Sequence, residues 1–108
     1  MKHIDRYFKL WDYVVSMNKL LIRSPKSGGG RNMDLQFFGV KYMRLGSSLD
    51  GVTISESPTW PFNEPAPVEL ADSMVFVLNT KYRTDVVVAS EMIVQENDLD
   101  IMESSLGR

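Results

Sequence analysis

Cysteine is absent from the 108-residue sequence, and histidine occurs once, at His3. The lack of cysteine excludes disulfide scaffolds, thiolate zinc sites and thiol nucleophiles, and it favours a reducing compartment, so we expect a cytoplasmic protein. A single histidine beside the N-terminus is a poor catalytic base or metal ligand. No apolar run approaches the ~20 residues of a membrane-spanning helix, and the early Asp5 argues against a secretory signal, so we expect no membrane contact.

Established catalytic patterns are also missing. The sequence has no G-x-S-x-G elbow, and the acidic stretch at 97–103 lacks the central glycine of a calcium loop. The fourteen acidic residues allow some carboxylate pair in space, but the sequence does not select one. We therefore expect no metal, cofactor or catalytic residue, and the sequence favours a non-enzyme over an enzyme.

Glycine is concentrated in the stretch SPKSGGGRN, residues 24–32. A phosphate-binding P-loop needs its lysine after the glycines and a helix behind it. Here Lys26 precedes the glycines and the following segment has the pattern of a strand. Lys26, Arg31 and bare amides leave a weak anion nest open as an alternative, but we predict a flexible connection between two strands.

The overall composition is that of one ordinary domain spanning residues 1–108, with 44% hydrophobic and 24% charged residues. Charge is unevenly distributed along it. Residues 1–54 hold nine Lys and Arg against four Asp, a net charge of +5, whereas residues 55–108 hold three against ten acids, a net of −7. Either the two halves interleave on one surface, or a dipolar molecule favours self-association or a charged partner.

The N-terminal third predicts a short helix and then a hairpin. Ile4, Tyr7, Phe8 and Trp11 follow helical spacing, so we expect a helix over residues 3–10. Residues 10–25, LWDYVVSMNKLLIRSP, predict two strands that turn at 17–19, with Asn18 in the left-handed conformation. A helix continuing from residue 3 to about 17 is the competing interpretation.

The remaining segments predict short strands and one more helix. Residues 33–42 alternate as a strand that is bulged beside Gly39, 46–51 form a turn, and 52–55 return as a strand. Residues 56–69 hold four of the five prolines and predict an irregular segment. Residues 74–79 and 86–94 predict a second hairpin. A short C-terminal helix follows, capped by Asn97 or Asp98 and ended by Gly107.

These segments together predict an α+β fold that is mainly β. We expect a single small soluble domain with a curled antiparallel sheet, or a partly open barrel, of six to seven strands. The short N-terminal helix would cover one opening, and the short C-terminal helix would close the chain.

The proline-framed stretch PTWPF, residues 58–62, is the most promising functional feature. Trp60 and Phe62 either fold back as a lid over the sheet or present an apolar anchor to a partner. In an open barrel they would line the mouth, where a small apolar ligand contacts them and the aromatic side chains of the first hairpin. The predicted ligand-binding or partner-binding residues are Trp60, Phe62, Trp11, Tyr13, Arg23 and Tyr42.

The sequence favours a non-catalytic protein-interaction domain that self-associates as a homodimer, because catalytic chemistry is absent, charge is asymmetric and seven methionines offer adaptable surfaces. A small-molecule-binding pocket is the alternative. The third hypothesis is a barrel that binds single-stranded nucleic acid through aromatic and basic residues of the first half. The isoelectric point of about 5.3 opposes that hypothesis, so we do not expect nucleic acid as a partner.

Overall fold

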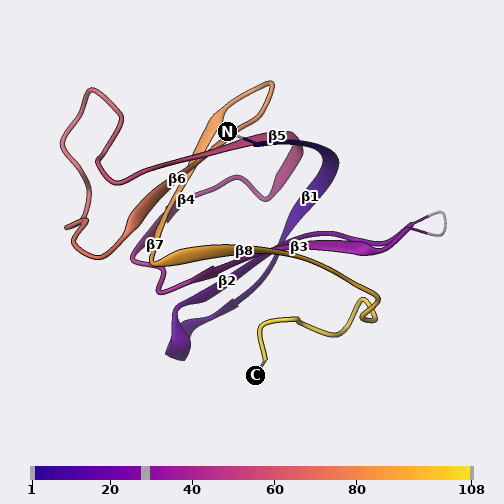
Figure 1. Cartoon of the computed structure of the whole chain (residues 1–108). Coiled ribbons are helices and arrows are strands. Elements are labelled where there is room, and N and C mark those ends of the chain that lie inside the picture. Colours follow the sequence, from indigo (N-terminus) through magenta and orange to yellow (C-terminus); the bar gives the residue numbers. More distant parts are fainter. Residues whose placement is uncertain (1, 28–29, 108) are drawn as a thin grey trace.

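A single antiparallel sheet contains all the strands of the computed structural model, which describes residues 2–27 and 30–107 (Figure 1). The sheet has eight strands in the order β4-β7-β6-β5-β1-β2-β3-β8. The expected antiparallel sheet is confirmed. The predicted α+β class is wrong, since the described residues contain no α-helix and the strands number eight instead of six or seven. The strands are β1 (Lys2–Val14), β2 (Lys19–Ser24), β3 (Asn32–Phe38), β4 (Tyr42–Arg44), β5 (Ser48–Ser57), β6 (Met74–Asn79), β7 (Thr84–Ala89) and β8 (Glu91–Asn97).

The predicted N-terminal helix is wrong, because residues 3–10 belong to the long, bent strand β1 (Figure 1). Ile4 and Phe8 lie in the same core cluster, but a spacing of four places residues on one face of a strand as well as of a helix. Between them Arg6 breaks the apolar alternation. The Arg6 guanidinium donates a hydrogen bond to the Ser24 hydroxyl, with Nε and Oγ 2.9 Å apart.

Trp11, three residues after Phe8, lies on the opposite face by strand alternation and packs in a separate cluster there. A β-bulge follows, because the register of β1 against β2 shifts between Leu10 and Asp12, and this shift returns Tyr13 to the main core. The competing helix to residue 17 is also wrong, since only a 3₁₀ turn occurs at Val15–Met17. The turn predicted at residues 17–19 is confirmed, with Asn18 left-handed at a φ of 50°.

The sheet folds over so that one face packs against itself. Phe37 of β3 and Phe76 of β6 meet edge to face with ring centroids 5.6 Å apart, although β5, β1 and β2 separate their strands in the sheet. This inner face forms the main core. Its fully buried members include Phe8, Leu20, Leu35, Phe37, Leu78 and Val87.

The sheet has a corner at Gly39 and Ser90, which divides two predicted strands into four. The stretches 33–42 and 86–94, each predicted as one strand, are divided there into β3 and β4 and into β7 and β8. Backbone hydrogen bonds continue across the corner, from Ser90 N to Phe38 O at 2.8 Å and from Lys41 N to Val88 O at 2.8 Å. Gly39 has a φ of +64°, which glycine adopts more readily than other residues, so the expected bulge is instead the end of β3.

The strand predicted at residues 74–79 is confirmed as β6. The turn predicted at 46–51 is too long, because β5 already begins at Ser48. The irregular segment predicted at 56–69 is displaced to residues 58–73, which contain no strand. The glycine-rich stretch joins the hairpin of β2 and β3, although Gly28 and Gly29 lie outside the described residues.

The predicted C-terminal helix is wrong. Residues 98–107, here called the tail, contain only isolated turns, and Gly107 has a φ of +69°. Leu106 is the one buried residue among them, so the tail lacks the apolar stripe that stabilises a surface helix. Its carbonyls bond instead to side chains of the sheet.

Candidate functional site

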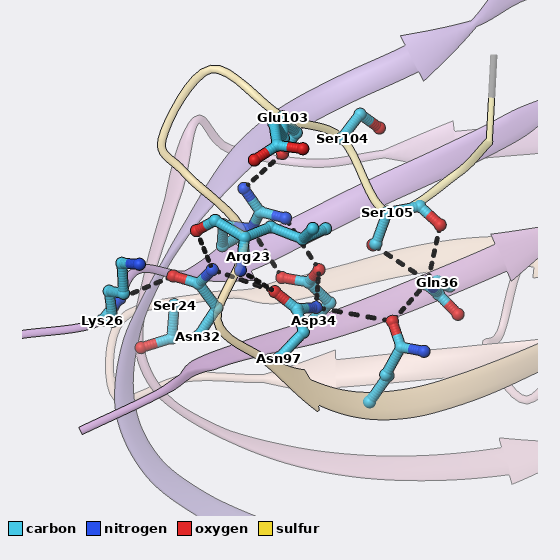
Figure 2. Close-up of polar contacts among 12 residues, drawn as sticks. Arg23, Ser24, Lys26, Asn32, Asp34, Gln36, Asn97, Glu103, Ser104 and Ser105 are labelled. Atoms are coloured by element: carbon cyan, nitrogen blue, oxygen red, sulfur yellow. Dashed lines mark hydrogen bonds and ion pairs between the residues drawn. The ribbon is translucent and has the colours of Figure 1, made fainter.

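A polar patch on the outer face of β2 and β3 lies beneath the tail (Figure 2). Strand alternation accounts for its composition. In β3 the apolar Leu35 and Phe37 face the main core, which leaves the polar Asn32, Asp34 and Gln36 on the outer face. All three polar residues are nevertheless buried.

The centre of the patch is an ion pair between Arg23 and Asp34, whose side chains are both 0% exposed. The two residues are direct cross-strand partners. Arg23 donates from Nε to Oδ1 at 2.7 Å and from Nη2 to Oδ2 at 2.9 Å, the forked geometry in which arginine binds carboxylates best. Asn97 of β8 adds a third bond, from Nδ2 to Oδ2 at 2.8 Å.

The remaining surface of the Arg23 guanidinium is also occupied. Its Nη1 donates to the carbonyl oxygen of Glu103 in the tail at 2.8 Å (Figure 2). Its Cζ lies 5.4 Å from the centre of the Trp11 ring, within the range of a cation–π contact. Arg23 therefore links β1, β2, β3 and the tail.

Asp34 is held in its ionised form. Burial raises the pKa of its carboxyl, but hydrogen bonds from Arg23, Ser105 and Asn97, with the charge of Arg23, outweigh burial and hold the pKa below its usual value. A carboxylate with so many donors is a poor proton acceptor. The arrangement is suited to holding a chain segment and unsuited to general base catalysis.

The tail is held mainly through its backbone carbonyls. Donors from the sheet bond to four of them: Asn32 Nδ2 to Leu99 O at 2.9 Å, Arg23 Nη1 to Glu103 O at 2.8 Å, Gln36 Nε2 to Ser105 O at 3.2 Å, and Lys19 Nζ to Leu106 O at 3.5 Å. The single apolar anchor is Leu106, which is 4% exposed and packs with Val14, Leu21 and Trp11. We call the sheet residues that contact the tail the tail groove: Trp11, Val14, Lys19, Leu21, Arg23, Asn32 and Gln36.

Three of the six predicted site residues form a separate cluster. Trp60 packs edge to face on Phe62 and on Tyr42, with centroids 5.1 and 6.3 Å apart. The three rings cover valines of β6 and β7 on the outer face. Among the described residues, Trp60 Nε1 is the one buried side-chain polar atom without a hydrogen-bond partner. This packing is that of a lid.

The other three predicted residues lie elsewhere. Trp11 and Arg23 meet in the tail groove, whereas Tyr13 packs against the main core and donates its hydroxyl to Asn18 Oδ1 at 3.2 Å. The six residues thus belong to three places and do not line one site.

Sequence reasoning missed Asp34, Gln36 and the tail. The alternation of Asn32, Asp34 and Gln36 with apolar residues was visible, but it is also the pattern of a strand with one solvated face. No local signal showed that a segment more than sixty residues away covers it.

Among the described residues, no group of three or more His, Asp or Glu side chains is placed to hold a metal ion. Residues 2–27 and 30–107 include no helix that could span a membrane. Comparisons with protein-family models, with curated proteins and with solved structures found no match to this chain.

Proposed function

We propose that the protein is a non-catalytic interaction domain that self-associates as a two-fold dimer through the free edge of β8. The observation that carries this proposal is the pairing of β8. Among the described residues its seven-residue length is hydrogen-bonded to β3 alone. An unpaired edge of this length is a template for another strand. The sequence EMIVQEN contains neither the lysine nor the proline that commonly protects such edges.

The other edge strand, β4, is protected. It is only three residues long, and the irregular segment 58–73 is fastened beside it. Lys41 Nζ donates to the carbonyl oxygen of Ala71 at 2.8 Å, and Arg44 forms an ion pair with Glu64 at 3.8 Å. The contrast between the edges supports β8 as the one used for association.

The edge of β8 is complementary to itself. Antiparallel pairing of two copies centred on Val94 brings no two acidic side chains opposite each other, and like charges directly opposite would be destabilising. Ile93, which is 43% exposed, would gain cover from the second copy. The facing pairs are Glu91 with Asn97, Met92 with Glu96, Ile93 with Gln95, and Val94 with itself.

The test is the molar mass in solution. The 12.3-kDa chain should sediment as a dimer at micromolar concentration, and Ile93→Lys should convert it to a monomer by placing a charge on the edge. The matched control is Ile101→Lys, at an exposed tail position, which should leave the dimer intact. A wild-type monomer at every concentration would contradict self-association. A dimer that survives Ile93→Lys would contradict the use of β8.

A second candidate function rests on a hollow of about 260 Å³ that reaches the core. Its apolar side, formed by Ile54, Phe76 and Met92, suits a small apolar ligand, while Lys2 and Glu56 lie at the same hollow. The probe is 1-anilinonaphthalene-8-sulfonate, whose fluorescence should rise with the native protein and stay low with Ser55→Trp, which fills the hollow. Equal fluorescence with both proteins would contradict this candidate.

We do not propose binding of single-stranded nucleic acid. Phe8 and Phe37, two of the aromatic residues that the hypothesis requires, are 0% exposed in the main core and cannot stack on bases. A cytoplasmic location stays an expectation that the absence of cysteine supports.

A further inference from the structure

We propose that the tail groove is a docking site for a turn-containing segment of a partner protein, and that the chain's own tail is its displaceable occupant. The tail lies on the groove as a bound peptide would. It forms no strand, and sheet side chains bond to the carbonyls of Leu99, Glu103, Ser105 and Leu106.

The contacts define the chemistry of a suitable partner. Backbone carbonyls are common to all peptides, so these bonds require little particular sequence. They do require the turn that the tail makes, in which Glu103 N donates to Asp100 O at 2.9 Å. Specificity comes first from Leu106, three residues after the carbonyl that accepts from Arg23, in a pocket formed by Val14, Leu21 and Trp11. Two polar side chains of the tail add to it: the Ser105 hydroxyl accepts from Gln36 Nε2 at 2.9 Å, and Asp98 forms an ion pair with Arg31 at 3.2 Å. The partner segment therefore carries a leucine at this spacing.

The tail is held by polar contacts and buries little apolar surface compared with the strands. Ordering a chain segment has an entropic cost at every residue, yet Leu106 is the only buried residue of the tail. Ile101 is 62% exposed and Met102 is 89% exposed, so neither large apolar side chain contributes much burial. Segments with few buried contacts open locally, without global unfolding.

The groove has room that the tail does not fill. A hollow of about 310 Å³ lies between Ile101 and the groove residues Trp11 and Asn32, with Pro25 beside them. A partner with a larger aromatic side chain in the place of Ile101 would fill this hollow and outcompete the tail. Exchange of tails between two copies would replace identical contacts and leave the hollow unfilled, so we infer a different protein as the occupant.

Peptide binding to the 108-residue chain tests the proposal. Two fluorescein-labelled peptides would be used: one with the native sequence of residues 98–107 and one with Ile101→Trp. Each would be titrated against the wild-type protein and against the Leu106→Asp protein, in which the tail is released. The linked tail competes at a high effective concentration, so binding to Leu106→Asp should be at least tenfold tighter than to wild type. The Ile101→Trp peptide should bind more tightly than the native one.

Two controls keep this test decisive. The first control is a peptide that carries Leu106→Asp, which should not bind; binding equal to that of the native peptide would overturn the proposal. The proposal would also be overturned if the Leu106→Asp protein folds but binds no native peptide. Hydrogen exchange on the wild-type chain needs no variant: tail amides that exchange only through global unfolding would show that the tail is not displaceable.

The proposal goes beyond dimer formation and fails separately from it. Ile93→Lys removes the proposed dimer edge but no groove residue, so peptide binding should persist in that variant if the groove is used. A loss of dimer mass in Leu106→Asp would instead show that tails are exchanged between copies, and would overturn docking of a different partner.

Discussion

Replacement of Asp34 by asparagine should destabilise the fold strongly, because Arg23 would stay buried without its counter-charge. Both side chains are 0% exposed, and removing one member of such a pair typically costs about 3–5 kcal/mol. The asparagine keeps the shape of Asp34 and one acceptor oxygen for Arg23. The expected loss is therefore assigned to charge and not to a cavity.

The double variant Arg23→Met/Asp34→Leu should be much less destabilised than Asp34→Asn. Replacing both members of a buried ion pair by apolar residues is often neutral or stabilising by about 1–4 kcal/mol. Here the gain is reduced because the Glu103 carbonyl and the Asn97 amide each lose a partner, at about 1–3 kcal/mol per group if it stays dry. We expect a net loss of about 1–2 kcal/mol.

Urea unfolding followed by circular dichroism measures both variants. With a slope of about 2 kcal/mol per molar urea, Asp34→Asn should lower the midpoint by about 2 M and the double variant by less than about 1 M. A double variant as unstable as Asp34→Asn would refute the reasoning, since the charge would then not be the source of the loss. A loss below about 1 kcal/mol in Asp34→Asn would show that Arg23 reaches water when the tail opens.

Three further predictions concern the pH dependence that Asp34 causes, the corner at Gly39 and the lid residue Trp60. The pKa of Asp34 is lowered in the native state, so its carboxylate stabilises the fold above the unfolded-state pKa of about 3.9. This stabilisation is lost as the pH falls through the lower native value. The free energy of unfolding, measured from pH 5 to 2, should therefore fall less steeply in Asp34→Asn than in the wild type, and parallel curves would contradict this. Gly39→Ala should cost about 1–3 kcal/mol by thermal unfolding, because a Cβ there meets the Ser90 hydroxyl and lies 3.1 Å from its Cβ at positive φ. An added Cβ at Gly107 meets nothing within 4 Å, so Gly107→Ala should lower stability less. Ser90→Gly should partly restore the stability of Gly39→Ala. Equal losses of stability at the two glycines would argue against the close approach of Gly39 to Ser90. Trp60→Ala should lower stability by less than the about 3–5 kcal/mol typical of a fully buried tryptophan, because Trp60 is only partly buried. The molar mass measured by light scattering should not change, whereas a loss of dimer would identify Trp60 as an anchor.

Strand prediction succeeded where one apolar pattern continued without a bulge. The strand at 74–79 and the turn at Asn18 were both predictable, because a run of β-branched and aromatic residues and a left-handed asparagine are local signals. The N-terminal helix was not distinguishable from a strand. Ile4 and Phe8 share a face in either structure, and the bulge that returns Tyr13 to the core exists only once β2 is paired beside β1.

The candidate site was predictable only in fragments. Trp11 and Arg23 were among the predicted residues and do lie in the tail groove. Their partners were not predictable, because the burial of Asp34 depends on contacts with Arg23, with Asn97 and with a tail that is distant in sequence. Trp60 and Phe62 were paired correctly, but their contact with Tyr42 depends on how the irregular segment returns over β6 and β7.

The sequence by itself determined the strand-rich character of this protein and the turn at Asn18, since both depend on residues close together in the chain. It also excluded cysteine chemistry outright. Only the tertiary structure decided which polar residues are buried and which edge is open. These properties depend on contacts between distant segments: the tail over Arg23 and Asp34, and β8 beside β3 with no strand on its other side among the described residues.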